Sequence, residues 1–187
     1  MKKIPNSVRL IFFGTSSFAL PALEKLKASD MTPILIVSTP DRARGRNMAL
    51  SATPVKNWAG QNGIQIITPE LLKDPVTIQT LKNKNPDLFI AASYGNIIPK
   101  EILDIPPKGT INVHPSLLPK LRGPCPIQTA ILNNEETGIT LMLTDEKIDH
   151  GPILAISNFS AKGGSASGGQ FLIFKFTYKE LEQKLAE

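Results

Sequence analysis

Short apolar runs alternate along this chain with stretches in which apolar residues recur at helical spacing. A run that is apolar throughout is typical of a strand buried on both faces of a sheet. The predicted strands are residues 8–13, 33–38, 64–67, 87–93, 110–113 and 137–144, and the predicted helices are residues 18–27, 53–61, 75–83 and a segment beginning near Pro126. Strands alternating with helices predict an α/β fold, here a Rossmann-like, doubly wound, mostly parallel sheet with helices on both faces.

The first strand and helix are joined by Gly-Thr-Ser-Ser at residues 14–17. This turn resembles the opening of a nucleotide-binding unit, but the full G-x-G-x-x-G pattern is missing. The sequence therefore gives no reason to expect a dinucleotide.

Two predicted strands end in polar residues that could form a site. Asn112 and His114 lie two residues apart, so they share one face of their strand, and Pro115 ends that strand. The run 137–144 is followed by an acidic, turn-forming loop that contains Asp149. Open α/β sheets place ligands at the carboxyl ends of strands, so we expect the three side chains to face one cleft there.

An amide, an imidazole and a carboxylate together favour transfer of an acyl group to an amine. Asn112 and His114 can stabilise an oxyanion, and Asp149 can orient the imidazole or accept a proton. No Ser or Cys nucleophile has a base at a recognisable spacing, so a covalent enzyme intermediate is not expected. On residue chemistry alone, a strand cap, an interior histidine and a turn residue explain the same three positions equally well.

The segments INVHPSLLPKLRGPCPIQTAI and ETGITLMLTDEKIDHGPIL resemble the formyltransferase family that uses 10-formyltetrahydrofolate. The family motif is Asn-x-His before Ser-Leu-Leu-Pro, with a later D-x-x-x-D-x-G loop. The resemblance implies that Asn112, His114 and Asp149 are catalytic and that 10-formyltetrahydrofolate is the formyl donor. It also implies two groups of donor contacts, namely Ser116, Leu117, Leu118 and Pro119, and Tyr94, Gly95, Asn96, Ile97 and Ile98 in a stretch similar to A-Y-G-x-I-L-P.

Residues 39–56 interrupt the apolar pattern with Arg42, Arg44 and Arg46 on a loop rich in Gly and Pro. Guanidinium groups bind phosphate well, but on charge alone a solvated loop is the better supported interpretation. The sequence of this segment resembles the P-D-R-x-x-G-R…S-P-V-K loop of methionyl-tRNA formyltransferases. This resemblance implies initiator methionyl-tRNA as the partner. Two other interpretations stay open: a formyltransferase acting on a small amine such as an amino sugar nucleotide, and a non-catalytic folate-binding module.

Composition narrows the class further. The 187 residues are 41% hydrophobic, enough for one good core, and the net charge of +5 is compatible with an anionic partner. No apolar run reaches membrane-spanning length and the N-terminus lacks signal-peptide features, so neither a membrane nor secretion is expected. A single cysteine fits a cytoplasmic protein without a disulfide, and the spacing of the two histidines predicts no metal site.

The pattern changes near the C-terminus. We predict a catalytic domain at residues 1–160, and then a Gly/Ser-rich linker, a short strand at 171–176 and a helix at 178–186. The last helix resembles the one that follows the catalytic domain in methionyl-tRNA formyltransferases. That family continues into a tRNA-binding domain, and we expect these 187 residues not to include one, either because the sequence is a trimmed catalytic domain or because the enzyme is short. The sequence leaves the oligomeric state open.

Overall fold

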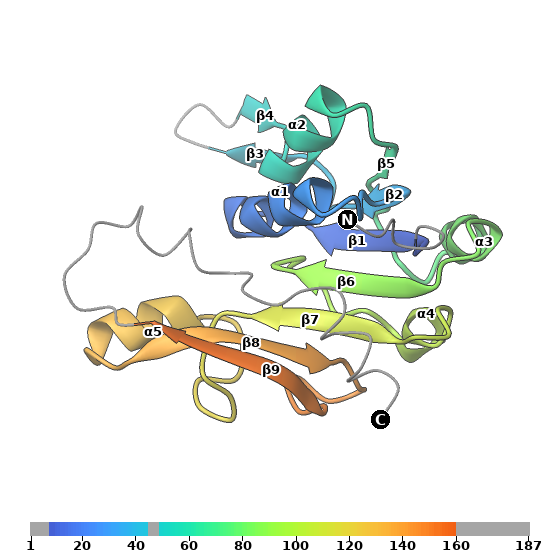
Figure 1. The fold of residues 1–187 in the computed structure, drawn as a ribbon. Helices are drawn as coiled ribbons and strands as arrows, with labels where there is room; N and C mark the ends of the chain where they lie inside the picture. Colours follow the sequence, from blue (N-terminus) through green and yellow to red (C-terminus); the bar gives the residue numbers. More distant parts are fainter. Residues whose placement is uncertain (1–7, 45–48, 160–187) are drawn as a thin grey trace. The chain divides into compact units, whose positions relative to one another are not determined.

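The computed structural model describes residues 8–44 and 49–159 (Figure 1). The chain divides into two compact units, Met1–Gly109 and Thr110–Glu187, and each is described by itself. The predicted linker, strand and helix beyond residue 160 lie outside the described residues, so the predicted domain boundary there stays a prediction.

The first unit contains a parallel sheet with the strand order β5-β2-β1-β6 (Figure 1). Its strands are β1 (Leu10–Gly14), β2 (Leu35–Val37), β5 (Ile66–Ile67) and β6 (Leu88–Ala92). Every residue of β1 and β6 is buried, as their unbroken apolar sequences predicted. The predicted α/β fold with a mostly parallel sheet is confirmed.

Helices connect these strands, and their first turns follow the sequence signals. The helices are the 3₁₀ turn η1 (Ser17–Ala19), α1 (Leu20–Ala28), α2 (Pro54–Gln61), α3 (Pro75–Asn83) and α4 (Lys100–Leu103). Thr53 caps α2 by accepting a hydrogen bond from the backbone N–H of Lys56, and Asp74 caps α3 in the same way. Proline begins both helices, where its missing N–H costs nothing. The short helix α4 was not predicted.

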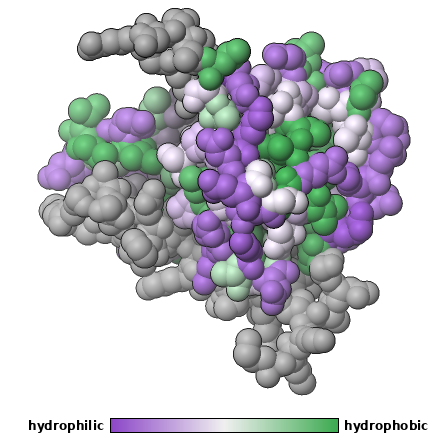
Figure 2. All heavy atoms as spheres, turned by 90° about the horizontal axis from the view of Figure 1, so that it is seen from above, coloured by the Kyte–Doolittle hydropathy of each residue, from purple (hydrophilic) through white to green (hydrophobic). Residues whose placement is uncertain are grey.

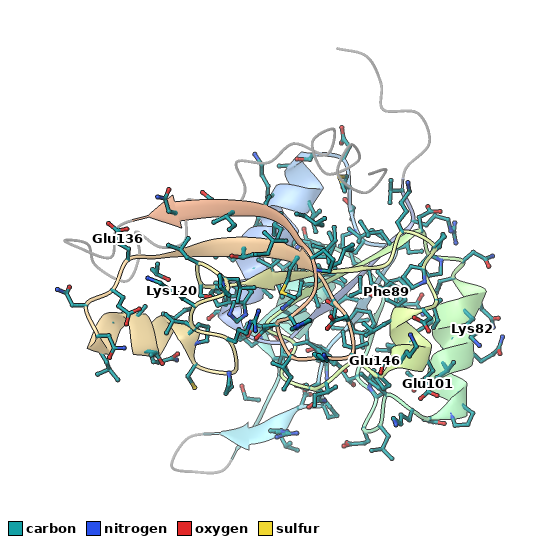
Figure 3. All side chains as sticks on the ribbon, turned by 90° about the horizontal axis from the view of Figure 1, so that it is seen from below. Lys82, Phe89, Glu101, Lys120, Glu136 and Glu146 are labelled. Atoms are coloured by element: carbon teal, nitrogen blue, oxygen red, sulfur yellow. The ribbon has the colours of Figure 1, made fainter. Side chains whose placement is uncertain are left out.

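The core of this unit forms between the sheet and its helices. Phe13 on β1 packs against Phe89 on β6 with ring centroids 5.1 Å apart, and Leu81 of α3 is fully buried against the same cluster. Phe89 is labelled in Figure 3. Complete burial of such a side chain contributes about 1.5–3 kcal/mol. This packing fixes the strand ends that carry the polar turns.

The second unit contains β7 (Thr110–His114), α5 (Pro126–Leu132), β8 (Thr137–Leu143) and β9 (Ile153–Phe159). These strands pair in the order β7-β8-β9, and both pairs are antiparallel. A parallel arrangement through this region, which the alternating pattern suggested, is therefore wrong. The connection from β8 to β9, residues 144–152, is shorter than the crossover of about a dozen or more residues that parallel neighbours need, so it suits antiparallel neighbours.

The arginine segment differs from the predicted loop. Arg42–Arg44 form β3 and Ala49–Ser51 form β4, and the two pair as an antiparallel hairpin. An ion pair of 2.6 Å between Asp41 and Lys56 ties the start of the hairpin to α2. Arg42 is exposed, whereas Arg46 lies outside the described residues.

The face seen in Figure 2 mixes hydrophilic side chains with smaller hydrophobic areas. Exposed apolar side chains include Leu50 on the hairpin and Ile131 and Leu132 on α5. None of the helices within residues 8–44 and 49–159 is long and apolar enough to cross a bilayer.

Candidate active site

The second unit brings together the three polar side chains predicted to be catalytic. Asn112 and His114 lie on the same face of β7, and both reach Asp149. The Asn112 amide donates to Asp149 Oδ1 at 3.2 Å, and His114 Nδ1 lies 3.4 Å from the same oxygen. The predicted convergence of these side chains is therefore present, while their catalytic roles stay predictions.

Asp149 is held by backbone geometry as well as by these partners. Its Oδ2 accepts a hydrogen bond of 2.9 Å from the backbone N–H of Gly123. Its φ of 48° lies in the left-handed region, which Asp tolerates better than most residues. With a side chain only 11% exposed, Asp149 is a largely buried carboxylate with a donor on each oxygen.

Each ring nitrogen of His114 faces an oxygen atom. His114 Nε2 lies 2.9 Å from the backbone oxygen of Leu121, which can only accept, so Nε2 carries a hydrogen. A hydrogen on Nδ1 makes the contact with Asp149 attractive. The two contacts hold the imidazole ring of His114 in one orientation beside the Asn112 amide.

The antiparallel register explains how Asp149 reaches this place. β8 runs against β7, so its last residue, Leu143, pairs with Ile111 at the start of β7. The carboxyl end of β8 is thus at the amino end of β7, and the expectation that the two segments meet at strand carboxyl ends is wrong for β8. The loop after β8 instead folds back over the face that carries Asn112 and His114.

The loop after β7 is tightly bonded in its own right. Ser116 and Leu118 are buried, and Ser116 Oγ donates to the backbone oxygen of Lys120 at 2.7 Å. Lys120 itself is exposed (labelled in Figure 3). Sequence reasoning missed the roles of Leu121 and Gly123, since both act through backbone atoms that leave no side-chain signal.

The other predicted donor-binding segment lies in the first unit, directly after β6. Tyr94 is buried in the core, edge-on to Phe13 with centroids 5.5 Å apart, so its ring serves packing. Burial raises the pKa of Tyr94 to about 12, and the Asn96 side chain offsets part of that rise. Gly95, Asn96 and Ile97 are exposed and available to a ligand.

The turn after β1 lies beside this segment. Thr15 donates its hydroxyl to the backbone oxygen of Tyr94 at 2.7 Å, and Ser16 donates to Ser93 Oγ at 2.7 Å. Both turns follow the carboxyl ends of parallel strands, which is where open α/β sheets bind ligands. The first unit therefore has a hydroxyl-rich edge at the carboxyl ends of β1 and β6.

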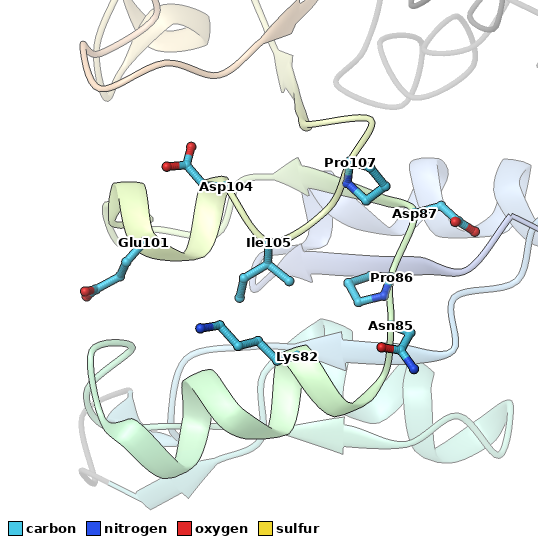
Figure 4. Close-up of a pocket in the computed structure, with 8 residues that line it drawn as sticks. All are labelled: Lys82, Asn85, Pro86, Asp87, Glu101, Asp104, Ile105 and Pro107. Atoms are coloured by element: carbon cyan, nitrogen blue, oxygen red, sulfur yellow. The ribbon is translucent and has the colours of Figure 1, made fainter.

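A hollow of about 620 Å³ lies at the other end of β6 (Figure 4). Lys82 from α3 and Ile105 from the loop after α4 point into it from opposite sides, and Asp87, directly before β6, is on its rim. The hollow lies at the amino end of β6, whereas the Tyr94 segment follows the carboxyl end of that strand. Within residues 8–44 and 49–159, no group of three or more His, Cys, Asp or Glu side chains is arranged to hold a metal ion.

The comparisons with known proteins identify the family. A family profile described as formyl transferase matches residues 8–165. The chain belongs to the formyl transferase family.

Curated relatives narrow the comparison. The chain is 47% identical over 150 residues to the methionyl-tRNA formyltransferase of Roseiflexus sp. (strain RS-1), which covers 79% of this chain and 46% of that protein. It is 48% identical over 146 residues to the methionyl-tRNA formyltransferase of Thermodesulfovibrio yellowstonii, covering 78% of this chain and 47% of that protein. The chain therefore spans about half the length of the curated relatives it matches.

Solved structures share the fold at lower identity. A phosphoribosylglycinamide formyltransferase from Bacillus halodurans superposes with a TM-score of 0.67 at 23% identity, over 95% of this chain and 87% of that chain. A sugar N-formyltransferase from a Shewanella species gives a TM-score of 0.57 at 21% identity, over 81% of this chain and 57% of that chain. At these identities the likeness concerns the fold alone.

Proposed function

We propose that this chain is the catalytic part of an enzyme that transfers a formyl group from 10-formyltetrahydrofolate to the amino group of methionyl-tRNA. The observation that carries the proposal is the convergence of Asn112 and His114 on Asp149 Oδ1, at 3.2 and 3.4 Å. The names of the curated relatives support the acceptor. Because the acceptor is an initiator tRNA, we place the reaction in the cytoplasm.

The three side chains take complementary roles in this proposal. Asn112 uses one amide hydrogen on Asp149 and has a second, which we assign to the formyl oxygen as negative charge develops there. We assign His114 to the stabilisation of the same developing charge, with its ring held by the Leu121 carbonyl and by Asp149. Asp149 keeps the imidazole in place, receives the proton that the attacking amine loses, and returns it to the donor nitrogen as the bond between that nitrogen and the formyl carbon breaks.

The exposed residues after β6 fit a folate-type donor. Ile97 is 77% exposed and offers apolar contact, while Asn96 offers an amide to a polar ring edge. A side chain added at Gly95 would meet nothing within 4 Å, so the backbone there is open to a ligand. We assign donor binding to Tyr94, Gly95, Asn96, Ile97 and Ile98, with Tyr94 contributing its backbone, and to Ser116, Leu117, Leu118 and Pro119. When bound, 10-formyltetrahydrofolate supplies the formyl group.

The hairpin of β3 and β4 is our candidate tRNA contact. Arg42 is exposed on β3, Arg44 lies two residues further along the same strand, and Arg46 follows in the part outside the described residues. A guanidinium binds a phosphate through two parallel hydrogen bonds, and each contact releases counterions from the nucleic acid. The ion pair between Asp41 and Lys56 would support the hairpin against α2 during that contact.

The first experiment tests the chemistry with a matched pair of histidine variants. His114→Ala should lower the rate of formyl transfer from 10-formyltetrahydrofolate to methionyl-tRNA by about 100-fold or more, as loss of an oxyanion-stabilising group does. His150→Ala should change the rate by less than about threefold, because surface substitutions seldom matter and the exposed His150 bonds to Asp145, outside the proposed catalytic residues. Equal rates for the parent and His114→Ala, with both proteins folded, would contradict the assignment.

The second experiment tests the acceptor. Arg42→Ala should weaken tRNA binding and reduce the salt dependence of that binding, whereas Lys82→Ala, which removes a charge from α3 in the same unit, should not. The same assay is run with an amino sugar nucleotide in place of tRNA. Formylation of the sugar alone would transfer the function to the small-amine alternative, and formylation of neither acceptor would favour a folate-binding module.

A further inference from the structure

Thr140 is a fully buried residue of β8, directly opposite His114 in the strand register. Its hydroxyl donates to the backbone oxygen of Ser116 at 2.7 Å and accepts from the backbone N–H of Leu118 at 3.1 Å. One side chain thus satisfies a carbonyl and an amide of the same loop. Neither group belongs to a helix or a strand, so this hydroxyl replaces the backbone pairing that the loop lacks.

The loop continues from these two bonds to the imidazole. The Ser116 hydroxyl donates to the backbone oxygen of Lys120 at 2.7 Å, and the backbone N–H of Lys120 donates to the oxygen of Leu117 at 3.1 Å. The next residue, Leu121, supplies the carbonyl that meets His114 Nε2 at 2.9 Å. The loop is therefore fixed at its start by Thr140 and at its end by His114.

Two other buried threonines of this unit lack such partners. The hydroxyls of Thr137, on the same strand, and Thr110, on β7, are buried without a hydrogen bond among the described residues. Burial of a hydroxyl without a partner costs stability. The Thr140 hydroxyl avoids this cost through its two hydrogen bonds, whereas those of Thr137 and Thr110 do not. The two bonds of Thr140 distinguish it from its neighbours.

We infer that Thr140 is a positioning residue of this enzyme, which holds the Ser116–Pro119 segment in the shape that binds the formyl donor. The inference rests on the proposed function, because that segment is the proposed donor contact. The hydroxyl acts through Ser116 and Leu118 and touches neither substrate. Its removal should therefore weaken donor binding more than it slows the chemical step.

The test compares Thr140→Val with Thr140→Ser, and Thr137→Val is the matched control. Val has nearly the shape of Thr but lacks the hydroxyl, whereas Ser keeps the hydroxyl and loses a methyl group. For Thr140→Val, we expect the KM for 10-formyltetrahydrofolate to rise about tenfold or more, with the KM for methionyl-tRNA unchanged. Thr140→Ser should restore the donor KM to within about threefold of the parent, and Thr137→Val should leave both KM values unchanged.

A second readout does not depend on activity. The amide hydrogen of Leu118 has the Thr140 hydroxyl as its acceptor, so hydrogen exchange at Leu118 should be at least about tenfold faster in Thr140→Val and near the parent rate in Thr140→Ser. If Thr140→Val does not fold, Thr140→Ala removes the same hydroxyl without adding volume.

The outcomes separate this inference from the proposed function. Faster Leu118 exchange together with a selective rise in the donor KM supports both. A parent chain that formylates no acceptor refutes the proposed function. Unchanged exchange of the Leu118 amide in Thr140→Val overturns the positioning role, whether or not the parent chain is active. A loss that affects both KM values and the rate equally, or that Thr137→Val reproduces, also overturns it.

Discussion

Gly151 is the position at which one added methyl group should do most damage to the proposed site. A Cβ built there would lie 1.9 Å from the backbone oxygen of Leu143 and 2.9 Å from its carbonyl carbon. Real Cβ atoms essentially never approach closer than 3.0 Å, so the two backbone segments must separate by at least 3.0 − 1.9 = 1.1 Å. Backbone atoms cannot rotate away as a flexible side chain can, so the loop itself has to move.

That movement would break a bond and displace a functional group. The N–H of Leu143 donates to the oxygen of Pro152 at 2.9 Å, and an added 1.1 Å would stretch this bond to about 4.0 Å, beyond hydrogen-bonding range. Overpacking costs about 1–3 kcal/mol and a lost hydrogen bond about 1 kcal/mol. We therefore expect Gly151→Ala to lower the free energy of unfolding by about 2–4 kcal/mol.

Activity should fall further than stability alone explains. Asp149 lies only two residues before Gly151, and its contacts with His114 and Gly123 are at 3.4 and 2.9 Å. A displacement of about 1 Å in a catalytic group can cost about 100-fold in rate. The loss should persist at temperatures where the variant is fully folded.

The assays are urea unfolding and formyl transfer to methionyl-tRNA, each with Gly60→Ala as the matched control. A Cβ at Gly60, in α2, would meet nothing within 4 Å, and Ala is the better helix former by about 0.5–1 kcal/mol. The control should therefore be slightly stabilised and fully active. A Gly151→Ala protein with parental stability and rate would show that the close approach at Leu143 does not constrain this loop.

Three further substitutions probe other contacts. Burial raises the pKa of Tyr94 from 10.0 to about 12, so the unfolded state releases the proton first and stability should fall as the pH rises between these values. Urea unfolding at a series of pH values should show no such loss for Tyr94→Phe. The same fall of unfolding free energy with alkaline pH in this variant would contradict the role of Tyr94. The side chain of His150 holds the pKa of Asp145 below 3.8, so its contribution to stability is present above that pH and is lost as the pH falls below it. Asp145→Asn should flatten the acid limb of the stability profile, and an identical limb would count against the pair. Trp58 donates its indole N–H to Glu24 at 2.6 Å, so Glu24→Ala should cost about 1–3 kcal/mol and shift the fluorescence of this single tryptophan; unchanged emission and stability would show that the bond is unimportant.

The sequence by itself determined the elements whose neighbours are local. Helix α3 begins at Pro75 and ends at Asn83 as predicted, because a cap, a proline and helical spacing all act within a few residues. Strands β1 and β6 were predictable since residues buried on both faces must be apolar throughout. The placement of Asn112 and His114 on one face also follows from the two-residue repeat of a strand.

The tertiary structure decided how distant segments meet. Antiparallel pairing of β7 with β8 puts Leu143 beside Ile111, and only a loop that folds back brings Asp149 to His114. The sequence named these residues through chemistry and resemblance, but strand direction depends on pairing across many residues. The hairpin that carries Arg42 was missed for the same reason, as its stability comes from cross-strand backbone bonds.

Backbone groups were the last part that only the tertiary structure could supply. The carbonyl of Leu121 and the N–H of Gly123 complete the contacts of His114 and Asp149, yet every residue has a carbonyl and nearly every residue has an N–H. Nothing in the amino-acid sequence distinguishes the backbone groups that point into a site. Thr140 is the intermediate case, because the sequence shows its hydroxyl and only the fold shows that the hydroxyl holds Ser116 and Leu118.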